Sequence, residues 1–130
     1  MLWLCLLALT SLASASMRTC GEGTATVTGF GGGPERPKVG DNETLWVAYD
    51  LTQPITGGKA LYDITLNYVP FPTTTEDLCT QTTCPKPVGT YNETSWSIFS
   101  GGVSGTIKSK ITWKDQNDAL VWCVETTLKV

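Results

Sequence analysis

The chain has 130 residues, a formal net charge of -3 and no histidine, and its sequence pI is about 4.8. This length fits one domain that can bury its own core. Acidic residues outnumber basic ones, twelve to nine, and no basic stripe is present, so we expect no nucleic-acid partner. The lack of histidine removes the commonest general base and the usual ligand of a mixed zinc site.

The first fifteen residues, MLWLCLLALTSLASA, form an apolar run that is too short to span a bilayer as a helix. The run ends in Ala13-Ser14-Ala15, a small-x-small pattern that suits signal peptidase. We therefore predict a signal peptide over 1–15 and one mature domain over 16–130. The predicted location is outside the cell or in the lumen of a lysosome or endosome. An uncleaved anchor and a buried strand are the alternative interpretations of the run.

Four cysteines remain once Cys5 has left with the signal peptide, and an even number in a secreted chain predicts disulfides. Cys79 and Cys84 are close enough in sequence to close a small loop. Cys20 and Cys123 then pair and tie the two ends of the mature domain together. A zinc site is the competing interpretation, but it needs two close pairs of ligands, usually with histidine.

Two Asn-x-Thr triplets begin at Asn42 and Asn92. Such triplets arise often by chance, but in a secreted chain with turn residues nearby each one predicts a surface glycan. Both asparagines are therefore candidate glycosylation sites.

Strand patterns fill most of the mature chain. Alternation of apolar and polar residues, or enrichment in Thr and Val, predicts strands over 24–30, 44–51, 59–69, 96–99, 106–113 and 119–130. No segment has the apolar stripe of period 3.6 and the caps that predict a helix. Six or seven short strands separated by Gly, Pro and Asn predict an all-β sandwich.

The run Val69-Pro70-Phe71-Pro72 interrupts the strand that begins at residue 59. Proline cannot donate a hydrogen bond to a sheet ladder, so Pro70 and Pro72 place this segment at a sheet edge. Phe71 is held between them on a stiff, extended backbone. It either caps the core or acts as a hydrophobic gate at the end of the sheets.

No set of residues predicts enzymatic chemistry. The carboxylate pairs Glu76 with Asp77 and Asp115 with Asp118 lie in predicted loops, where they are solvated. The run Gly31-Gly32-Gly33-Pro34 is expected to break the first strand as a flexible loop, since no Lys-Ser/Thr pattern follows it. We therefore predict a protein that is not an enzyme and has no cofactor, no metal and no catalytic residue.

Four motifs, taken in order, resemble the ML lipid-recognition domain family. They are Cys20 after the signal peptide, Val-Pro-Phe-Pro at 69–72, Cys-x4-Cys-Pro at 79–85, and Ile-Thr-Trp at 111–113 ahead of Cys123. The resemblance covers nearly the whole mature chain. The family includes sterol-transfer proteins and fungal phosphatidylglycerol/phosphatidylinositol transfer proteins.

The resemblance implies an immunoglobulin-like two-sheet sandwich with a lipid cavity between the sheets, and the pairings Cys20–Cys123 and Cys79–Cys84. It implies a monomer that binds a sterol or phospholipid, contacts membranes transiently and moves the lipid between them. Phe71, with Phe99 nearby, matches the mouth of the cavity. The predicted lining residues are Leu45, Val47, Tyr49, Leu66, Tyr68, Ile107, Ile111, Trp113 and Val124. The alternative function is a secreted immunoglobulin-like recognition module that has a solid core and binds a protein partner.

Overall fold

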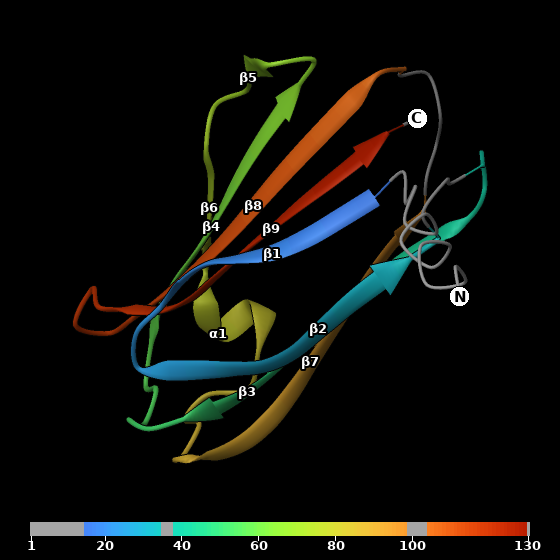
Figure 1. Ribbon diagram of the computed structural model, residues 1–130. Coiled ribbons are helices and arrows are strands. Elements are labelled where there is room, and N and C mark those ends of the chain that lie inside the picture. Colours follow the sequence, from blue (N-terminus) through green and yellow to red (C-terminus); the bar gives the residue numbers. More distant parts are fainter. Residues whose placement is uncertain (1–14, 35–37, 99–103, 130) are drawn as a thin grey trace, which may run out of the picture.

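The computed structural model describes residues 15–34, 38–98 and 104–129, and Figure 1 shows its strands arranged as two facing sheets. The larger sheet has the order β1-β9-β8-β4-β5, with β6 also paired to β4, and the smaller sheet has the order β2-β3-β7. Neighbouring strands are antiparallel throughout these ladders. The predicted all-β, two-sheet sandwich is therefore confirmed. Phe99 and most of the predicted signal peptide lie outside the described residues.

Most strand boundaries lie close to the predicted segments, but the strand predicted over 96–99 begins at Gly89. The larger sheet consists of β1 (Ala15–Glu22), β4 (Gly58–Leu66), β5 (Val69–Pro70), β6 (Thr74–Asp77), β8 (Thr106–Asp115) and β9 (Leu120–Lys129). The smaller sheet consists of β2 (Ala25–Gly33), β3 (Asn42–Leu51) and β7 (Gly89–Ile98). One short helix, α1 (Leu78–Gln81), follows β6.

Three of these elements were missed by the sequence analysis, namely β1, β6 and α1. Polar β1 has no alternating pattern, and its place is set by pairing with β9 along almost its whole length. The helix is one turn long, too short for an apolar stripe to be recognised. Its start is capped by Asp77, whose carboxylate accepts a hydrogen bond from the Cys79 N–H at 2.9 Å.

The predicted break at Gly31–Pro34 was wrong, because β2 continues through Gly33. The reason is the indole of Trp46 on the neighbouring strand β3, which lies across the glycines of β2. A Cβ atom on Gly31 would lie 2.6 Å from Nε1 of Trp46, and one on Gly29 would lie 3.2 Å from its ring. Glycine is therefore needed here for close approach, within a regular strand.

The core lies at the end of the sandwich where the β8–β9 turn joins the strands. Trp113 of β8 stacks on Trp122 of β9, with 4.4 Å between the ring centroids. Tyr49 of the smaller sheet packs edge-on against Trp113, with centroids 6.1 Å apart, and joins the two layers. Leu78 of α1 is fully buried and completes this end.

The structure contains the two disulfides that the spacing predicted. Cys20 pairs with Cys123 and links β1 to β9, with 5.0 Å between the Cα atoms. Cys79 pairs with Cys84, with 5.4 Å between the Cα atoms, and closes the loop that contains α1. Over the described ranges, no helix is long and apolar enough to cross a membrane.

The two disulfides are expected to differ in their contribution to stability, since they close loops of very different length. The sequence separation is 103 residues for Cys20–Cys123 and 5 residues for Cys79–Cys84. The chain-entropy model gives losses of roughly 4–5 kcal/mol and about 2 kcal/mol, respectively, when each bridge is removed. Denaturant unfolding of the two double Cys→Ala variants measures the difference. Equal losses would contradict this entropic account.

Candidate functional site

Burial decreases along the inward face of the larger sheet, from the β8–β9 turn toward β5. Across β4, β8 and β9 the inward rows are Ala60/Trp113/Trp122, Tyr62/Ile111/Val124, Ile64/Ser109/Thr126 and Leu66/Ile107/Leu128. The first row is buried. In the third row the side chain of Ile64 is 43% exposed, and the whole fourth row is only half-buried. Solvent therefore reaches an inward, largely apolar face at this end.

Burial also decreases along the inward face of the smaller sheet, in the same direction. On β3 the inward residues Leu51, Tyr49 and Val47 are buried, whereas Leu45 is only half-buried. Tyr49 packs against Trp113, so the buried ends of the two sheets coincide. The sandwich thus has a closed end and an open end, and on the smaller sheet the inward residues at the open end are Leu45 and Glu43.

Several inward side chains are small toward the open end. The third row of the larger sheet contains Ser109 and Thr126, and the inward partner of Leu45 on β2 is Gly32. The closed end has indoles at the corresponding depth. Facing sheets normally pack about 10 Å apart when their side chains interdigitate. Met17 of β1 pairs with Thr126 in this row, and its sulfur lies 3.6 Å from the position of a Cβ atom on Gly32.

The apolar inward face continues onto the edge strand β5. Val69 pairs with Leu66, and the N–H of Phe71 donates a hydrogen bond to the carbonyl of Ile64 at 2.9 Å. Alternation then places Val69 and Phe71 on the same face as Leu66 and Ile64. Both are exposed, Phe71 by 51%. They form an apolar rim at the open end, at the top of the larger sheet in Figure 1.

Tyr68 does not lie on this face, contrary to the prediction that it lines the interior. The strand predicted over 59–69 ends at Leu66, and Asn67 and Tyr68 form a turn with φ values of 49° and 69°. The Asn67 side chain fixes the turn, because its oxygen accepts from the Thr106 N–H and its amide donates to the carbonyl of Ser104. The alternation therefore stops, and Tyr68 is 86% exposed at the tip.

The other predicted lining residues that the structure describes divide into two groups. Val47, Tyr49, Trp113 and Val124 are buried in the core at the closed end. The half-buried group consists of Leu45, Leu66, Ile107 and Ile111. The first group lies at the closed end, and the second lies nearer the open end. Phe99, the predicted partner of Phe71, is not among the described residues.

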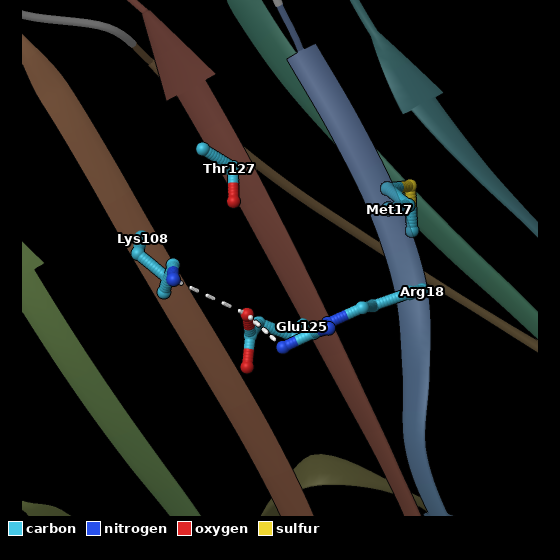
Figure 2. A pocket seen from close by; sticks show the side chains of 5 residues that line it. All are labelled: Met17, Arg18, Lys108, Glu125 and Thr127. Carbon is cyan, nitrogen blue, oxygen red and sulfur yellow. Dashed lines mark hydrogen bonds and ion pairs between the residues drawn. The ribbon is translucent and has the colours of Figure 1, made fainter.

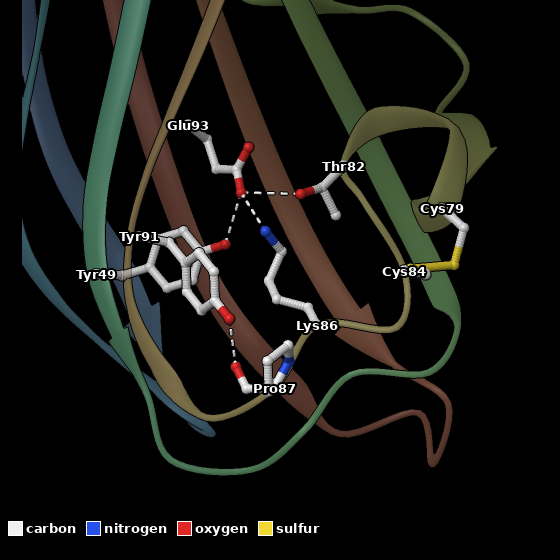
Figure 3. Close-up of polar contacts among 8 residues, drawn as sticks. All are labelled: Tyr49, Cys79, Thr82, Cys84, Lys86, Pro87, Tyr91 and Glu93. Atoms are coloured by element: carbon white, nitrogen blue, oxygen red, sulfur yellow. Dashed lines mark hydrogen bonds and ion pairs between the residues drawn. A yellow bond between two sulfur atoms is a disulfide. The ribbon is translucent and has the colours of Figure 1, made fainter.

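A polar cluster that the sequence analysis missed lies on the inward face of β7 (Figure 3). Three donors converge on one carboxylate oxygen of Glu93: the hydroxyl of Tyr49 at 2.8 Å, the hydroxyl of Thr82 at 2.9 Å and the ammonium of Lys86 at 2.9 Å. Lys86 is only 6% exposed, and its ammonium lies 4.0 Å from the centroid of the Tyr91 ring. The cluster therefore satisfies a lysine and a glutamate between the sheets.

The cluster joins three segments that are far apart in sequence. Tyr49 belongs to β3, Glu93 to β7, and Lys86 to the loop after the Cys79–Cys84 bridge. The backbone of Lys86 is held by two hydrogen bonds with Ile55, at 2.8 and 2.9 Å. The edge strand β7 is thereby fastened to the loop of the larger sheet. The chemistry of the cluster is that of a structural clasp, with every donor directed at one acceptor.

The surroundings of Glu93 shift two pKa values in opposite directions. Burial alone would raise the pKa of Glu93, but the hydrogen bonds from Lys86, Tyr49 and Thr82 and the charge on Lys86 outweigh it and lower that pKa. Burial, followed by the hydrogen bond to the Glu93 carboxylate, raises the pKa of the Tyr49 hydroxyl. Glu93 is therefore ionised and Tyr49 neutral near pH 7.

A hollow of about 300 Å³ lies against the larger sheet and is lined by Met17, Arg18, Lys108, Glu125 and Thr127 (Figure 2). Glu125 lies 3.0 Å from the Arg18 guanidinium and 3.6 Å from the Lys108 ammonium. Both cations are substantially exposed, so these ion pairs contribute little to stability. None of the predicted lipid-binding residues lines this hollow.

Two facing sheets, joined by a packed aromatic core and less buried toward β5, define a two-sheet β-sandwich. The family described as ML domain matches residues 14–130. The chain therefore belongs to the ML domain family and has its lipid-binding fold, as the motif resemblance predicted. No curated protein matches the sequence.

Solved structures with the same fold are distant in sequence. A Niemann-Pick type C2 protein from the Japanese carpenter ant is 13% identical, with a TM-score of 0.67 over 88% of this chain and 98% of that one. Chicken MD-1, in a complex with lipid IVa, is 16% identical, with a TM-score of 0.60 over 88% of each chain. At these identities the likeness establishes the fold alone.

The cluster around Glu93 predicts a stability loss on acidification. Because the folded-state pKa of Glu93 lies below its unfolded value of about 4.3, its contribution is complete above that value and is lost as the pH falls through the folded pKa. Glu93→Gln should lower the free energy of unfolding at pH 7 by about 2 kcal/mol. Removing one partner of a fully buried ion pair costs roughly 3–5 kcal/mol of stability. The expected loss is smaller here because the Glu93 side chain is 24% exposed.

Denaturant unfolding between pH 7 and pH 3 measures this effect. The difference between wild type and Glu93→Gln should shrink as the pH falls. Glu76→Gln, at an exposed position of β6, is the matched control and should leave stability nearly unchanged. A difference that stays constant over the whole pH range would show that ionisation of Glu93 contributes nothing.

Proposed function

We propose that this protein binds the apolar part of a sterol or phospholipid between its two sheets and moves the lipid between membranes. The observation that carries the proposal is the decrease of burial along both inward faces toward the open end. Membership of the ML domain family supports it. The same fold in chicken MD-1, which was crystallised with lipid IVa, is consistent with it.

The binding energy comes from removing hydrocarbon from water. Each buried methylene contributes roughly 0.8 kcal/mol, so a chain that buries about a dozen of them gains enough to leave a bilayer. The half-buried walls at Leu45, Leu66 and Ile107 supply apolar contact without any reacting group. Binding is therefore non-covalent and reversible, and the protein is not an enzyme.

Transfer needs an entrance that can meet a membrane. Phe71 and Val69 border the open end, and Tyr68 projects beyond them at the tip of the β4–β5 turn. These exposed apolar groups provide a transient membrane contact, and Phe71 is the gate of the interior. We place the protein outside the cell or in an endolysosomal lumen, as a monomer, after removal of residues 1–15.

Mass spectrometry of lipid extracted from the purified protein tests the proposal. Wild type should carry a co-purifying sterol or phospholipid. Leu66→Lys places a charge on the inward wall and should abolish that lipid. Leu61→Lys, on the outward face of the same strand, is the control and should retain it. Absence of lipid from folded wild type, together with saturable capture of a protein partner, would favour the alternative recognition module.

Phe71→Ala is expected to slow lipid transfer between vesicles severalfold while leaving the fold intact. Phe71 is half exposed at the rim, so truncation removes a contact with the lipid but little of the core. Val88→Ala is the matched control, because Val88 is equally exposed and precedes β7 at the closed end. A fluorescent-lipid assay measures the transfer rate, and circular dichroism checks the fold. Equal transfer rates for Phe71→Ala and wild type would overturn the gate.

A further inference from the structure

The asparagine and the threonine of each Asn-x-Thr triplet lie on the outer face of the smaller sheet. On β3 the inward residues alternate with Asn42, Thr44 and Trp46, and on β7 they alternate with Asn92, Thr94 and Trp96. The register pairs Thr44 with Trp96, Trp46 with Thr94, and Ala48 with Asn92. The acceptor asparagine and the threonine of each triplet therefore share one surface.

The two tryptophans on this face have different surroundings. Trp46 is 37% exposed, and its indole packs over Gly29 and Gly31 of β2. Trp96 is 67% exposed on the edge strand β7. An indole this exposed on a free sheet edge is prone to association with another chain unless something covers it.

The register places Trp96 between the two triplets. It lies directly opposite Thr44 and diagonally opposite Asn42, which pairs with Ile98. Diagonal neighbours across an antiparallel pair are about 7–8 Å apart, a separation that an asparagine side chain and one sugar ring can span. Asn92 precedes Trp96 by four residues on the same face and is farther away along the strand.

We propose that Asn42 and Asn92 both carry N-linked oligosaccharides and that the first sugar on Asn42 packs its apolar C–H face against Trp96. The sugars then cover the outer face of the smaller sheet and the exposed edge of β7. This inference rests on entry into the secretory pathway, which is part of the proposed function. It leaves the open end and the outer face of the larger sheet as the surfaces available for docking.

The modification is a group transfer with a defined donor class. The side-chain amide nitrogen of each asparagine attacks the anomeric carbon of a lipid-diphosphate-linked oligosaccharide. A C–N bond forms and the C–O bond to the diphosphate breaks. The diphosphate leaves with the electron pair of that bond, and the amide nitrogen loses one proton. The transferase of the secretory pathway supplies the base, so nothing in this chain needs to be catalytic.

The first test uses the full chain, expressed in and secreted from eukaryotic cells, with intact mass measured before and after peptide-N-glycosidase. Wild type should lose two oligosaccharides, Asn42→Gln and Asn92→Gln one each, and the double variant none. A secreted wild-type chain without sugars would overturn this proposal and leave the lipid function standing. Sugars on a secreted chain that carries no lipid would support this proposal and overturn the lipid function. A chain kept in the cytosol without sugars would overturn both this proposal and the predicted location.

Hydroxyl-radical footprinting tests the packing, because each tryptophan is read in its own peptide. Asn42→Gln should raise the oxidation of Trp96 severalfold above that of the glycosylated wild type, whereas Asn92→Gln should change it little. Trp46 serves as the internal control, since the glycines beneath it are present in every variant. Equal oxidation of Trp96 in wild type and in Asn42→Gln would overturn the stacking of the sugar on Trp96.

Discussion

The sandwich depends on the contact between Tyr49 of the smaller sheet and the stacked pair Trp113 and Trp122 of the larger one. These three side chains are buried at the closed end, where they set the separation of the layers. Rings of this size hold the backbones of the two sheets apart. Toward Gly32 the inward side chains become smaller, and the Met17 side chain of β1 lies there, with its sulfur 3.6 Å from the position of a Cβ atom on Gly32.

Packing is therefore concentrated at one end of these strands, and the proposed lipid site lies at the other. The inward residues near the β8–β9 turn bury their apolar area in the folded protein, while those near β5 remain half-buried. A ligand that filled the open end would bury the inward side chains that are partly exposed there. The clasp around Glu93 stabilises the arrangement, because it fastens β7 to the loop at Lys86. Bound lipid should consequently stabilise the fold, since it binds the folded state only.

The sequence predicted most of the fold because alternation reports which side chains share a face. That is why the inward residues of β3, β8 and β9 were found. Tyr68 was misplaced because alternation does not report a turn, and this turn is made by the side chain of Asn67. Glu93 was missed because a charged residue among threonines and serines suggests an outward position. Its inward place depends on Lys86, whose position comes from tertiary contacts with Ile55.

The outer faces of the two sheets differ in a way that bears on how the protein meets its surroundings. The larger sheet presents the exposed cations Arg18 and Lys108, paired with Glu125, and such charges discourage association of sheets. On β3 and β7 the outward residues are mostly threonines, tryptophans and the two triplet asparagines. A face with so little charge and a free edge needs another form of protection. The proposed sugars on Asn42 and Asn92 would provide it without altering the interior, so this surface could be covered independently of the proposed lipid site.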